Sequence, residues 1–158
     1  MLAKEIMSRD PACCTPTDTL RTAARLMADN DCGCLPVVES ADQKRVVGVL
    51  TDRDIAIRAV ARGKSPDSTV NDVMTPSPTC CSPDDDVEDV ERIMTDRQVR
   101  RVPVVAADGR VVGMIAQADL AREDRALSDR DVGRIVEKIS EPTPPRHTID
   151  RQQPEQRL

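Results

Sequence analysis

The sequence of 158 residues contains no phenylalanine, tyrosine or tryptophan. A nucleobase or cofactor ring therefore cannot stack on an aromatic side chain, as it does in proteins that bind single-stranded nucleic acid. Any planar ligand must instead lie between aliphatic side chains or beneath an arginine. The formal net charge is −5, with acidic and basic residues interspersed. This balance gives no reason to expect the concentrated positive face that nucleic acids require, although local basic clusters could occur, and no nucleic-acid partner is expected.

Long hydrophobic runs are also missing. The longest apolar stretches, such as RVVGVL, are far shorter than the roughly 20 residues that span a bilayer. The first ten residues, MLAKEIMSRD, lack the apolar stretch of a signal peptide. We therefore expect a soluble cytoplasmic protein with no membrane segment.

Few residues suit catalysis. The only histidine is His147, near the end of the chain, and no nucleophile stands beside a general base. The six glycines do not form a loop that could cradle a phosphate. The sequence therefore does not predict an enzyme.

What the sequence does contain is an internal repeat. At an offset of 67, the cysteine pair 13–14 coincides with the pair 80–81, and LPVV at 35–38 coincides with VPVV at 102–105. The offset then falls to 65, because ESADQKR is two residues longer than AADGR, and VVGVLTDRDI coincides with VVGMIAQADL. A length difference confined to a polar segment is typical of a loop, so the two copies should share one fold.

Each copy carries the pattern β-α-β-β-α. An extended piece near PACC or PTCC leads into a helix, two β-rich runs follow, and a second helix closes the unit, at about 52–62 and 117–126. Apolar residues in the first helix of each copy recur at helical spacing: Leu20, Ala23, Ala24 and Met27, then Val87, Val90, Ile93 and Met94. We predict an α/β fold of tandem β-α-β-β-α repeats packed about a pseudo-two-fold axis.

These patterns divide the chain into five segments. Residues 1–62 form the first repeat, 63–69 a linker, and 70–126 the second repeat. One repeat alone would leave an apolar sheet face exposed, so the two copies should fold together. Residues 127–140 are predicted to form a C-terminal helix. Residues 141–158 are rich in proline, glutamine and arginine, with almost no apolar residues, and are predicted to be a disordered tail.

The C-terminal helix is expected to begin at Ser128, whose side chain can cap it. Its apolar residues fall on one face, which we expect to pack on the core or on a partner: Val132, Ile135, Val136 and Ile139.

The duplicated pattern resembles the CBS-domain pair, also called a Bateman module. The resemblance covers residues 3–126 and rests on LPVV…VVGVLTDRDI followed by RRVPVV…VVGMIAQADL, where spacing, order and duplication agree. Family membership implies a non-catalytic sensor that binds an adenosine derivative, such as AMP, ATP, NAD or S-adenosylmethionine, in the cleft between the repeats. It also implies a homodimer. The chain resembles stand-alone sensors that signal to a protein target, which the sequence does not name.

The strand-to-helix junction of the first repeat has two interpretations. Thr51 with Asp54 three residues later matches a capping box, which stabilises a helix by ~1 kcal/mol. The same helix N-terminus can bind a phosphate through its N–H groups and the Thr51 hydroxyl, while Asp54 accepts hydrogen bonds from a ribose diol. Carried over from the family, Asp54 and Asp119 would each bind a ribose. Ala116 replaces the threonine in the second repeat, so two unequal sites are expected.

Three arginines are candidate phosphate ligands. Arg100 and Arg101 precede VPVV, where some family members place basic residues that reach ligand phosphates. Solvent-exposed arginines at a strand entry are the alternative. Arg53 lies within the first junction and could point to solvent. Val37 and Pro103 are core positions that could also line an aliphatic adenine slot.

Six cysteines occupy strand or strand-entry positions: Cys13, Cys14, Cys32, Cys34, Cys80 and Cys81. Their spacing does not match a zinc ribbon, and adjacent cysteines in a strand point to opposite faces, so no metal site is predicted. Buried structural thiols are favoured. The alternative function is a redox- or metal-responsive interaction protein that keeps the CBS fold without binding a nucleotide.

Overall fold

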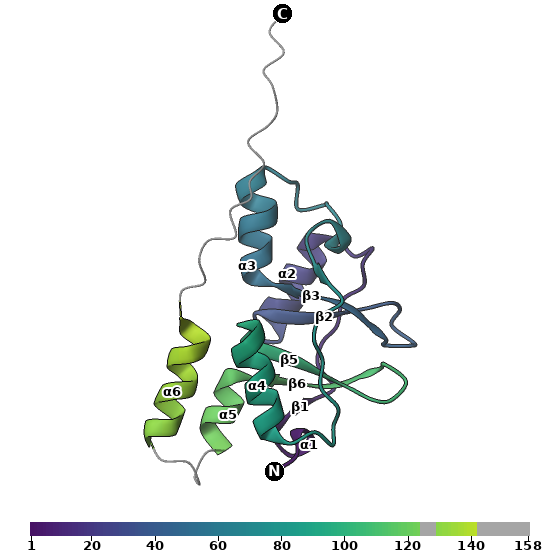
Figure 1. Ribbon diagram of the computed structural model, residues 1–158. Coiled ribbons are helices and arrows are strands. Elements are labelled where there is room, and N and C mark those ends of the chain that lie inside the picture. Colours follow the sequence, from purple (N-terminus) through teal and green to yellow (C-terminus); the bar gives the residue numbers. More distant parts are fainter. Residues whose placement is uncertain (124–128, 142–158) are drawn as a thin grey trace, which may run out of the picture.

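The computed structural model describes residues 1–123 and 129–141, and in it two three-stranded sheets are each covered by helices (Figure 1). The main elements of the first half are α2 (Leu20–Asp29), β2 (Cys34–Val38), β3 (Val46–Thr51) and a helix over 52–62. Those of the second half are α4 (Val87–Arg97), β5 (Arg101–Val105), β6 (Val111–Ala116) and α5 (Gln117–Glu123). The predicted α/β fold of tandem repeats is confirmed.

The helix over 52–62 is not a regular α-helix. It begins with α3 (Asp52–Asp54), continues as a π-helical turn (Ile55–Ala59) and closes with a 3-10 turn (Val60–Arg62). It ends at Gly63, whose φ of 70° is the left-handed conformation that glycine adopts at little cost. We refer to all of residues 52–62 as the junction helix, which Figure 1 labels α3.

Each sheet takes its third strand from the segment that precedes the other half's first long helix. β1 (Ser8–Arg9), which follows α1 (Ala3–Ile6), pairs with β6 of the second half. β4 (Thr75–Pro76), which follows a 3-10 turn at Val70–Asp72, pairs with β3 of the first half. The first extended piece of each repeat was predicted near the cysteine pairs, but the paired strands β1 and β4 lie before those pairs. There the chain makes only single parallel bridges, between Cys14 and Val37 and between Cys81 and Val104.

Each of the two hydrophobic cores also contains residues from the other half of the sequence. Ala3 is fully buried in the second core, although it belongs to the first repeat in sequence, while Val70 and Val73 are buried in the first core. Neither core holds an aromatic ring, so aliphatic, methionine and cysteine side chains fill the space. The segments 1–62 and 70–126 are therefore sequence repeats, and each packing unit borrows residues from the other.

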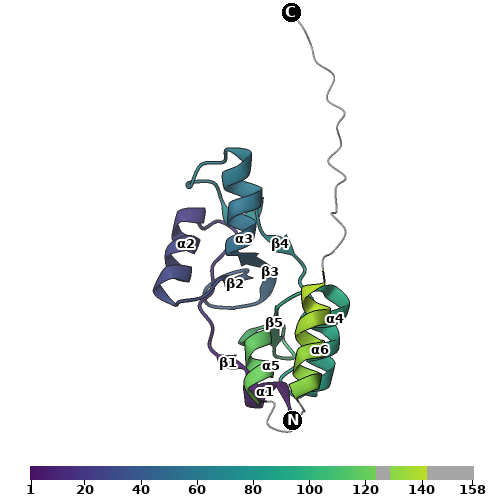
Figure 2. The same cartoon turned by 90° about the vertical axis from the view of Figure 1, so that its left-hand side faces the viewer.

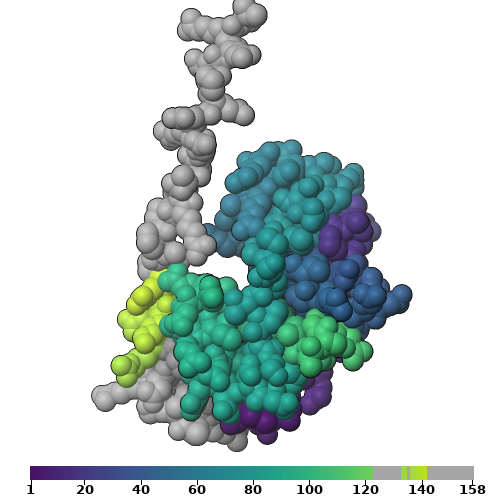
Figure 3. Space-filling view, turned by 45° about the vertical axis from the view of Figure 1, so that its right-hand side comes forward, coloured from purple at the N-terminus to yellow at the C-terminus, as the bar shows by residue number. Residues whose placement is uncertain are grey.

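The hairpin turns form a second set of contacts between the halves. The turn after β2 lies against the turn after β5, with an antiparallel bridge between Arg45 and Arg110 (Figure 3). The Val46 N–H donates to the Gly109 carbonyl at 3.1 Å, and the Val111 N–H donates to the Lys44 carbonyl at 2.9 Å. The two-residue length difference between the repeats falls in these turns.

A further helix, α6 (Asp129–Ser140), packs on α4, beside the second half in Figure 2. Ile139 is 4% exposed in the second core, as its place on the apolar face predicts. Val136, on the same apolar face, is 40% exposed in the single chain, because the contact with α4 covers only part of the helix. The expected cap Ser128 and the expected disorder of residues 142–158 lie outside the described residues.

Along α2, three of the four residues at the predicted apolar spacing are buried. Ala24, at the same apolar spacing of α2, is exposed, while Leu20, Ala23 and Met27 are buried.

Within the described residues, no helix is both long and apolar enough to cross a membrane.

Candidate functional site

The strand-to-helix junction of the first half is a complete capping box. The Asp54 N–H donates to the Thr51 hydroxyl oxygen at 3.0 Å, and the Thr51 N–H donates to Asp54 Oδ2 at 3.0 Å. The cap uses the Thr51 hydroxyl as an acceptor, so its proton can be donated to an anion. It uses one of the two Asp54 carboxylate oxygens. The predicted capping box is thus formed, and its two hydrogen bonds hold both side chains in place.

The second junction forms half of this arrangement. The Ala116 N–H donates to Asp119 Oδ2 at 2.7 Å, but Ala116 offers no hydroxyl to accept a bond in return. In both repeats, then, the aspartate accepts a hydrogen bond from the N–H of the residue that ends the strand. Only the first junction can offer a hydroxyl to a ligand.

Backbone hydrogen bonds join the start of each closing helix to the residue that precedes β2 or β5. The Asp52 N–H donates to the Gly33 carbonyl at 3.0 Å, and the Gln117 N–H donates to the Arg100 carbonyl at 2.9 Å. These two bonds occupy equivalent positions in the repeats. A Cβ on Gly33 would lie 2.7 Å from Asp52 Oδ2, so glycine allows this carboxylate to lie over the strand entry.

Arg101 and Cys34, equivalent residues of the two repeats, come together at the boundary between the halves. Burial raises the pKa of the Cys34 thiol to about 11, and the nearby charge of Arg101 acts in the opposite direction. The carboxylates of Asp54 and Asp52 raise the same pKa. The structure therefore places Arg101 of the second repeat near Cys34 of the first. The sequence could not show this, because it depends on how the two sheets face each other.

The other predicted site residues are more dispersed. Arg53 and Arg100 are exposed. Val37 has no exposed surface and packs in the first core, and Pro103 is buried in β5. These two side chains are primarily structural, as their positions in the strands require.

Arg58 is a site residue that the sequence analysis missed. Its Nε lies 3.7 Å from Asp54 Oδ1, and its Nη1 donates to the Val73 carbonyl at 3.1 Å and to the Thr75 hydroxyl at 3.2 Å. The spacing of four residues between Asp54 and Arg58 on a helix could have predicted the ion pair. No pattern in the sequence indicated the contacts between Arg58 and residues 73–75.

The cysteines are free thiols, and Cys14, Cys34 and Cys81 are buried. Burial raises the pKa of Cys14 and of Cys81 to about 12, so these thiols stay protonated and weakly nucleophilic at neutral pH. In the part of the chain that the structure describes, no three or more histidine, cysteine, aspartate or glutamate side chains gather as a metal site would require.

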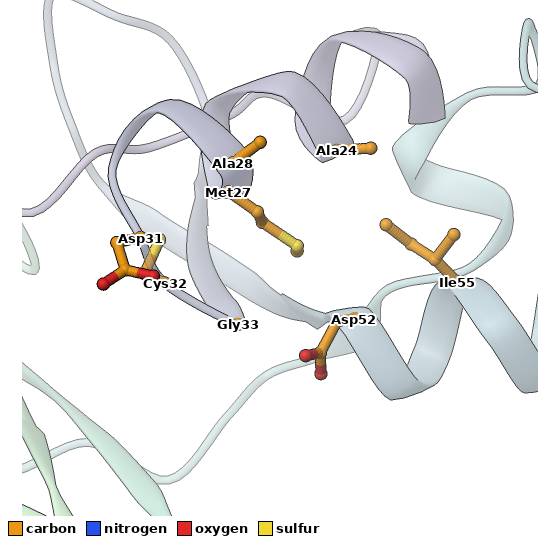
Figure 4. Close-up of a pocket in the computed structure, with 8 residues that line it drawn as sticks. All are labelled: Ala24, Met27, Ala28, Asp31, Cys32, Gly33, Asp52 and Ile55. Atoms are coloured by element: carbon orange, nitrogen blue, oxygen red, sulfur yellow. The ribbon is translucent and has the colours of Figure 1, made fainter.

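The structure has a groove that is separate from the cleft predicted between the repeats. It encloses about 450 Å³ between α2 and the junction helix, within the first half (Figure 4). One side is apolar, with Met27 and Ile55 pointing into the space, and the carboxylates of Asp31 and Asp52 lie at the other side. Its remaining lining residues are Ala24, Ala28, Cys32 and Gly33. In the second half, α6 packs on α4, the helix equivalent to α2.

Comparison with known proteins identifies the class that this architecture defines. The model of the CBS domain matches the chain twice, over residues 3–60 and 70–126. The chain therefore belongs to the CBS domain family and contains a tandem pair of these domains. It is 35% identical over 137 residues to the CBS domain-containing protein YhcV of Bacillus subtilis, a match that covers 87% of this chain and 94% of that protein.

Solved structures give the same assignment. Hypoxic Response Protein I, solved with two coordinated zinc ions, is 33% identical, with a TM-score of 0.70 over 81% of this chain and all of that one. The CBS domain pair of MJ0100, solved with 5-methylthioadenosine and S-adenosyl-L-methionine, is 29% identical, with a TM-score of 0.71 over 78% of this chain and 95% of that one. CBSX2 in complex with AMP is 25% identical, with a TM-score of 0.67 over 78% and 95%.

Proposed function

We propose that this protein is a regulatory module that binds an adenosine-type ligand between its two CBS repeats and signals the occupancy to a protein target. The observation that carries the proposal is the first junction, where Thr51 and Asp54 are held by the cap while a hydroxyl proton and a carboxylate oxygen remain able to bind. The ligands of MJ0100 and CBSX2 support the ligand class, since each is an adenosine derivative. The exposed arginines of the junction region supply positive charge for a phosphate.

The proposal assigns different roles to the two junctions. At the first, Asp54 accepts from the ribose hydroxyls, Thr51 donates to a phosphate or its equivalent, and Arg101 reaches the site from the second repeat. At the second, Asp119 can accept from a ribose, but Ala116 cannot donate to a phosphate. A phosphate-bearing ligand should therefore bind first at the Thr51 and Asp54 junction.

Isothermal calorimetry tests this function directly, and it does not need the tryptophan fluorescence that the sequence rules out. AMP, ATP, NAD and S-adenosylmethionine are titrated into the wild type and into Asp54→Asn and Asp119→Asn. Asparagine keeps the size and one acceptor oxygen of the side chain, so the cap is disturbed little. We expect Asp54→Asn to weaken binding by about tenfold or more, and Asp119→Asn to weaken it less.

Asp96→Asn, an exposed position on α4, serves as the matched control and should bind like the wild type. Binding that is unchanged in Asp54→Asn would show that the site is elsewhere. If none of the four ligands binds at millimolar concentration, nucleotide sensing is wrong for this chain.

The alternative of a metal-responsive protein is supported by one observation, the two zinc ions of Hypoxic Response Protein I. The residues of the present chain fit this poorly, because the described part holds no cluster of metal ligands and the buried thiols stay protonated. A melting temperature that rises with zinc in a chain that binds no nucleotide would favour this alternative.

We also propose that the protein forms a homodimer through the first-half groove. The junction helix beside this groove exposes Ile57 by 46% and Val60 by 71%, and the small side chains of Ala24 and Ala28 face solvent across it. Burial of this surface in a second copy would remove apolar area from water. Figure 2 looks onto the face that carries α2 and the junction helix.

A further inference from the structure

Arg58 connects two parts of the molecule that are distant in sequence. Its guanidinium Nη1 donates to the carbonyls of Val73 and Met74, at 3.1 and 3.4 Å, and to the Thr75 hydroxyl at 3.2 Å. Its Nε faces Asp54 Oδ1 at 3.7 Å. One side chain therefore touches both the carboxylate of the candidate ligand site and the segment that enters β4.

The carboxylate on one side of this link is well defined. Asp54 is 15% exposed, and its Oδ2 is held by the Thr51 N–H. Its Oδ1 is the oxygen that faces Arg58, and it is also the oxygen that the cap leaves to a ligand. A diol that donates to Asp54 Oδ1 therefore shares this oxygen with the guanidinium.

The segment on the other side leads from the first half to the second. Residues 73–75 run into β4, where Thr75 pairs with Val49 of β3. The side chain of Met74 lies over Gly48, where a Cβ would be 2.8 Å from the Met74 sulfur. The next residue after β4, Ser77, has a φ of 48°, and the chain then crosses to Cys81 in the second core.

The second repeat cannot build the same link. At the offset of 65, the residue equivalent to Arg58 is Glu123, and an ionised carboxylate has no proton to donate to a carbonyl. The asymmetry adds to the one between Thr51 and Ala116. In sequence, the second repeat thus has neither the threonine nor the arginine of the first junction.

We infer that Arg58 is a positioning residue that couples occupancy of the Asp54 pocket to the segment 73–75 between the halves. The inference rests on the proposed nucleotide binding at this pocket. When a ribose hydroxyl donates to Asp54 Oδ1, the carboxylate shares its charge between two partners, and the guanidinium shifts its hydrogen bonds toward Val73, Met74 and Thr75. The ligand thus changes how tightly the crossing segment is held.

The test combines calorimetry with hydrogen–deuterium exchange. The probe is whichever of AMP, ATP, NAD and S-adenosylmethionine binds the wild type most tightly. Exchange is followed at residues 51–58 and 73–77 with and without the probe, in the wild type, Arg58→Gln and Arg58→Lys. Arg62→Gln is the matched control, because Arg62 is exposed and lies one turn further along the junction helix.

In the wild type and Arg62→Gln, we expect the probe to change exchange in both segments. In Arg58→Gln, affinity should fall about fivefold or more, and the change at 73–77 should vanish while that at 51–58 remains. In Arg58→Lys, affinity should recover in part, because the charge near Asp54 is kept. The response at 73–77 should stay weak, because one ammonium group lacks the planar fork that spans several acceptors.

Each outcome decides a different point. If Arg58→Gln binds the probe as the wild type does and residues 73–77 still respond, the coupling role of Arg58 is wrong and the proposed function stands. If the wild type binds none of the four ligands, the proposed function fails, and the inference fails with it. Circular dichroism checks the fold of each variant. If Arg58→Gln is unfolded, Arg58→Lys decides, since an unchanged response at 73–77 in that variant contradicts the inference.

Discussion

Thr51 and Asp54 exchange two hydrogen bonds of 3.0 Å, one in each direction, at the point where β3 becomes the junction helix. The corresponding pair in the second repeat, Ala116 and Asp119, shares one bond of 2.7 Å. The repeated aspartate thus serves the same backbone contact in both halves. The threonine distinguishes them, because it closes the cap and can still donate its proton.

The two caps predict opposite effects on stability. Thr51→Ala should lower the free energy of unfolding by about 1 kcal/mol, because the Asp54 N–H loses its acceptor. Ala116→Thr should raise it by roughly 0.5–1 kcal/mol, because a hydroxyl would complete the second box. Urea unfolding followed by circular dichroism measures both. Equal losses in the two variants would contradict the role assigned to the hydroxyl.

Gly48 and Gly33 should differ in their tolerance of a methyl group. A Cβ at Gly48 would lie 2.9 Å from the Thr75 carbonyl oxygen, which is backbone in a paired strand. The nearest atoms to a Cβ at Gly33 would belong to the carboxylate of Asp52, which can rotate away. We expect Gly48→Ala to cost about 1–3 kcal/mol and Gly33→Ala clearly less. Unfolding of the two variants side by side tests this, and a larger loss in Gly33→Ala would show that Asp52 is rigidly held.

The buried thiols predict a loss of stability at alkaline pH. Burial raises the pKa of Cys14 and Cys81 from 9.0 to about 12, so the unfolded chain loses these protons first as the pH rises. The free energy of unfolding should therefore be unaffected below pH 9 and fall above it, by roughly 1 kcal/mol for each thiol at pH 10. No tyrosine titrates in this range to obscure the effect.

Urea unfolding at pH 7.5 and pH 10 measures this loss in the wild type and in the double variant Cys14→Ala, Cys81→Ala. The double variant should be less stable at pH 7.5, because two core side chains are shortened, but it should lose less on going to pH 10. A pH-dependent loss of the same size in both proteins would show that other groups cause it.

The proposed dimer predicts a sharp effect of charge on the junction helix. Val60 is 71% exposed in the single chain, so Val60→Glu should leave the fold intact and dissociate the dimer. Val136→Glu, at the exposed valine of α6, is the matched control and should leave the dimer intact. Size-exclusion chromatography with light scattering gives the mass of each. Dissociation by Val136→Glu alone would place the interface on α6 instead.

The repeated elements could be predicted from sequence because their signals are local. Leu20, Ala23 and Met27 recur at helical spacing and are buried on one side of α2. Thr51 and Asp54 stand at the spacing of a capping box and form one. Ala24 and Val136 share the apolar spacing of their helices and are nevertheless exposed, because periodicity fixes the direction of a side chain but not how far the neighbouring element extends over it.

For the candidate site too, local features could be predicted from the sequence, and contacts between distant residues could not. The sequence pointed to Thr51, Asp54 and Asp119, whose binding roles stay predictions. It gave no sign of the contacts between Arg58 and residues 73–75, which join positions 15 to 17 residues apart through a strand of the shared sheet. The groove beside α2 was also missed, because it depends on which helix faces remain uncovered.

By itself, the sequence determined the duplication, the order of helices and strands and the capping box of the first junction, because hydrogen bonding and periodicity act within a few residues. Only the tertiary structure decided that β1 and β4 cross to the opposite halves and that Arg101 comes near Cys34. Those contacts depend on the path of the chain through Asp10 and Ser77, two equivalent residues with φ of 48° that precede the crossings. A local pattern can indicate such a turn, but the packing of both sheets determines where it leads.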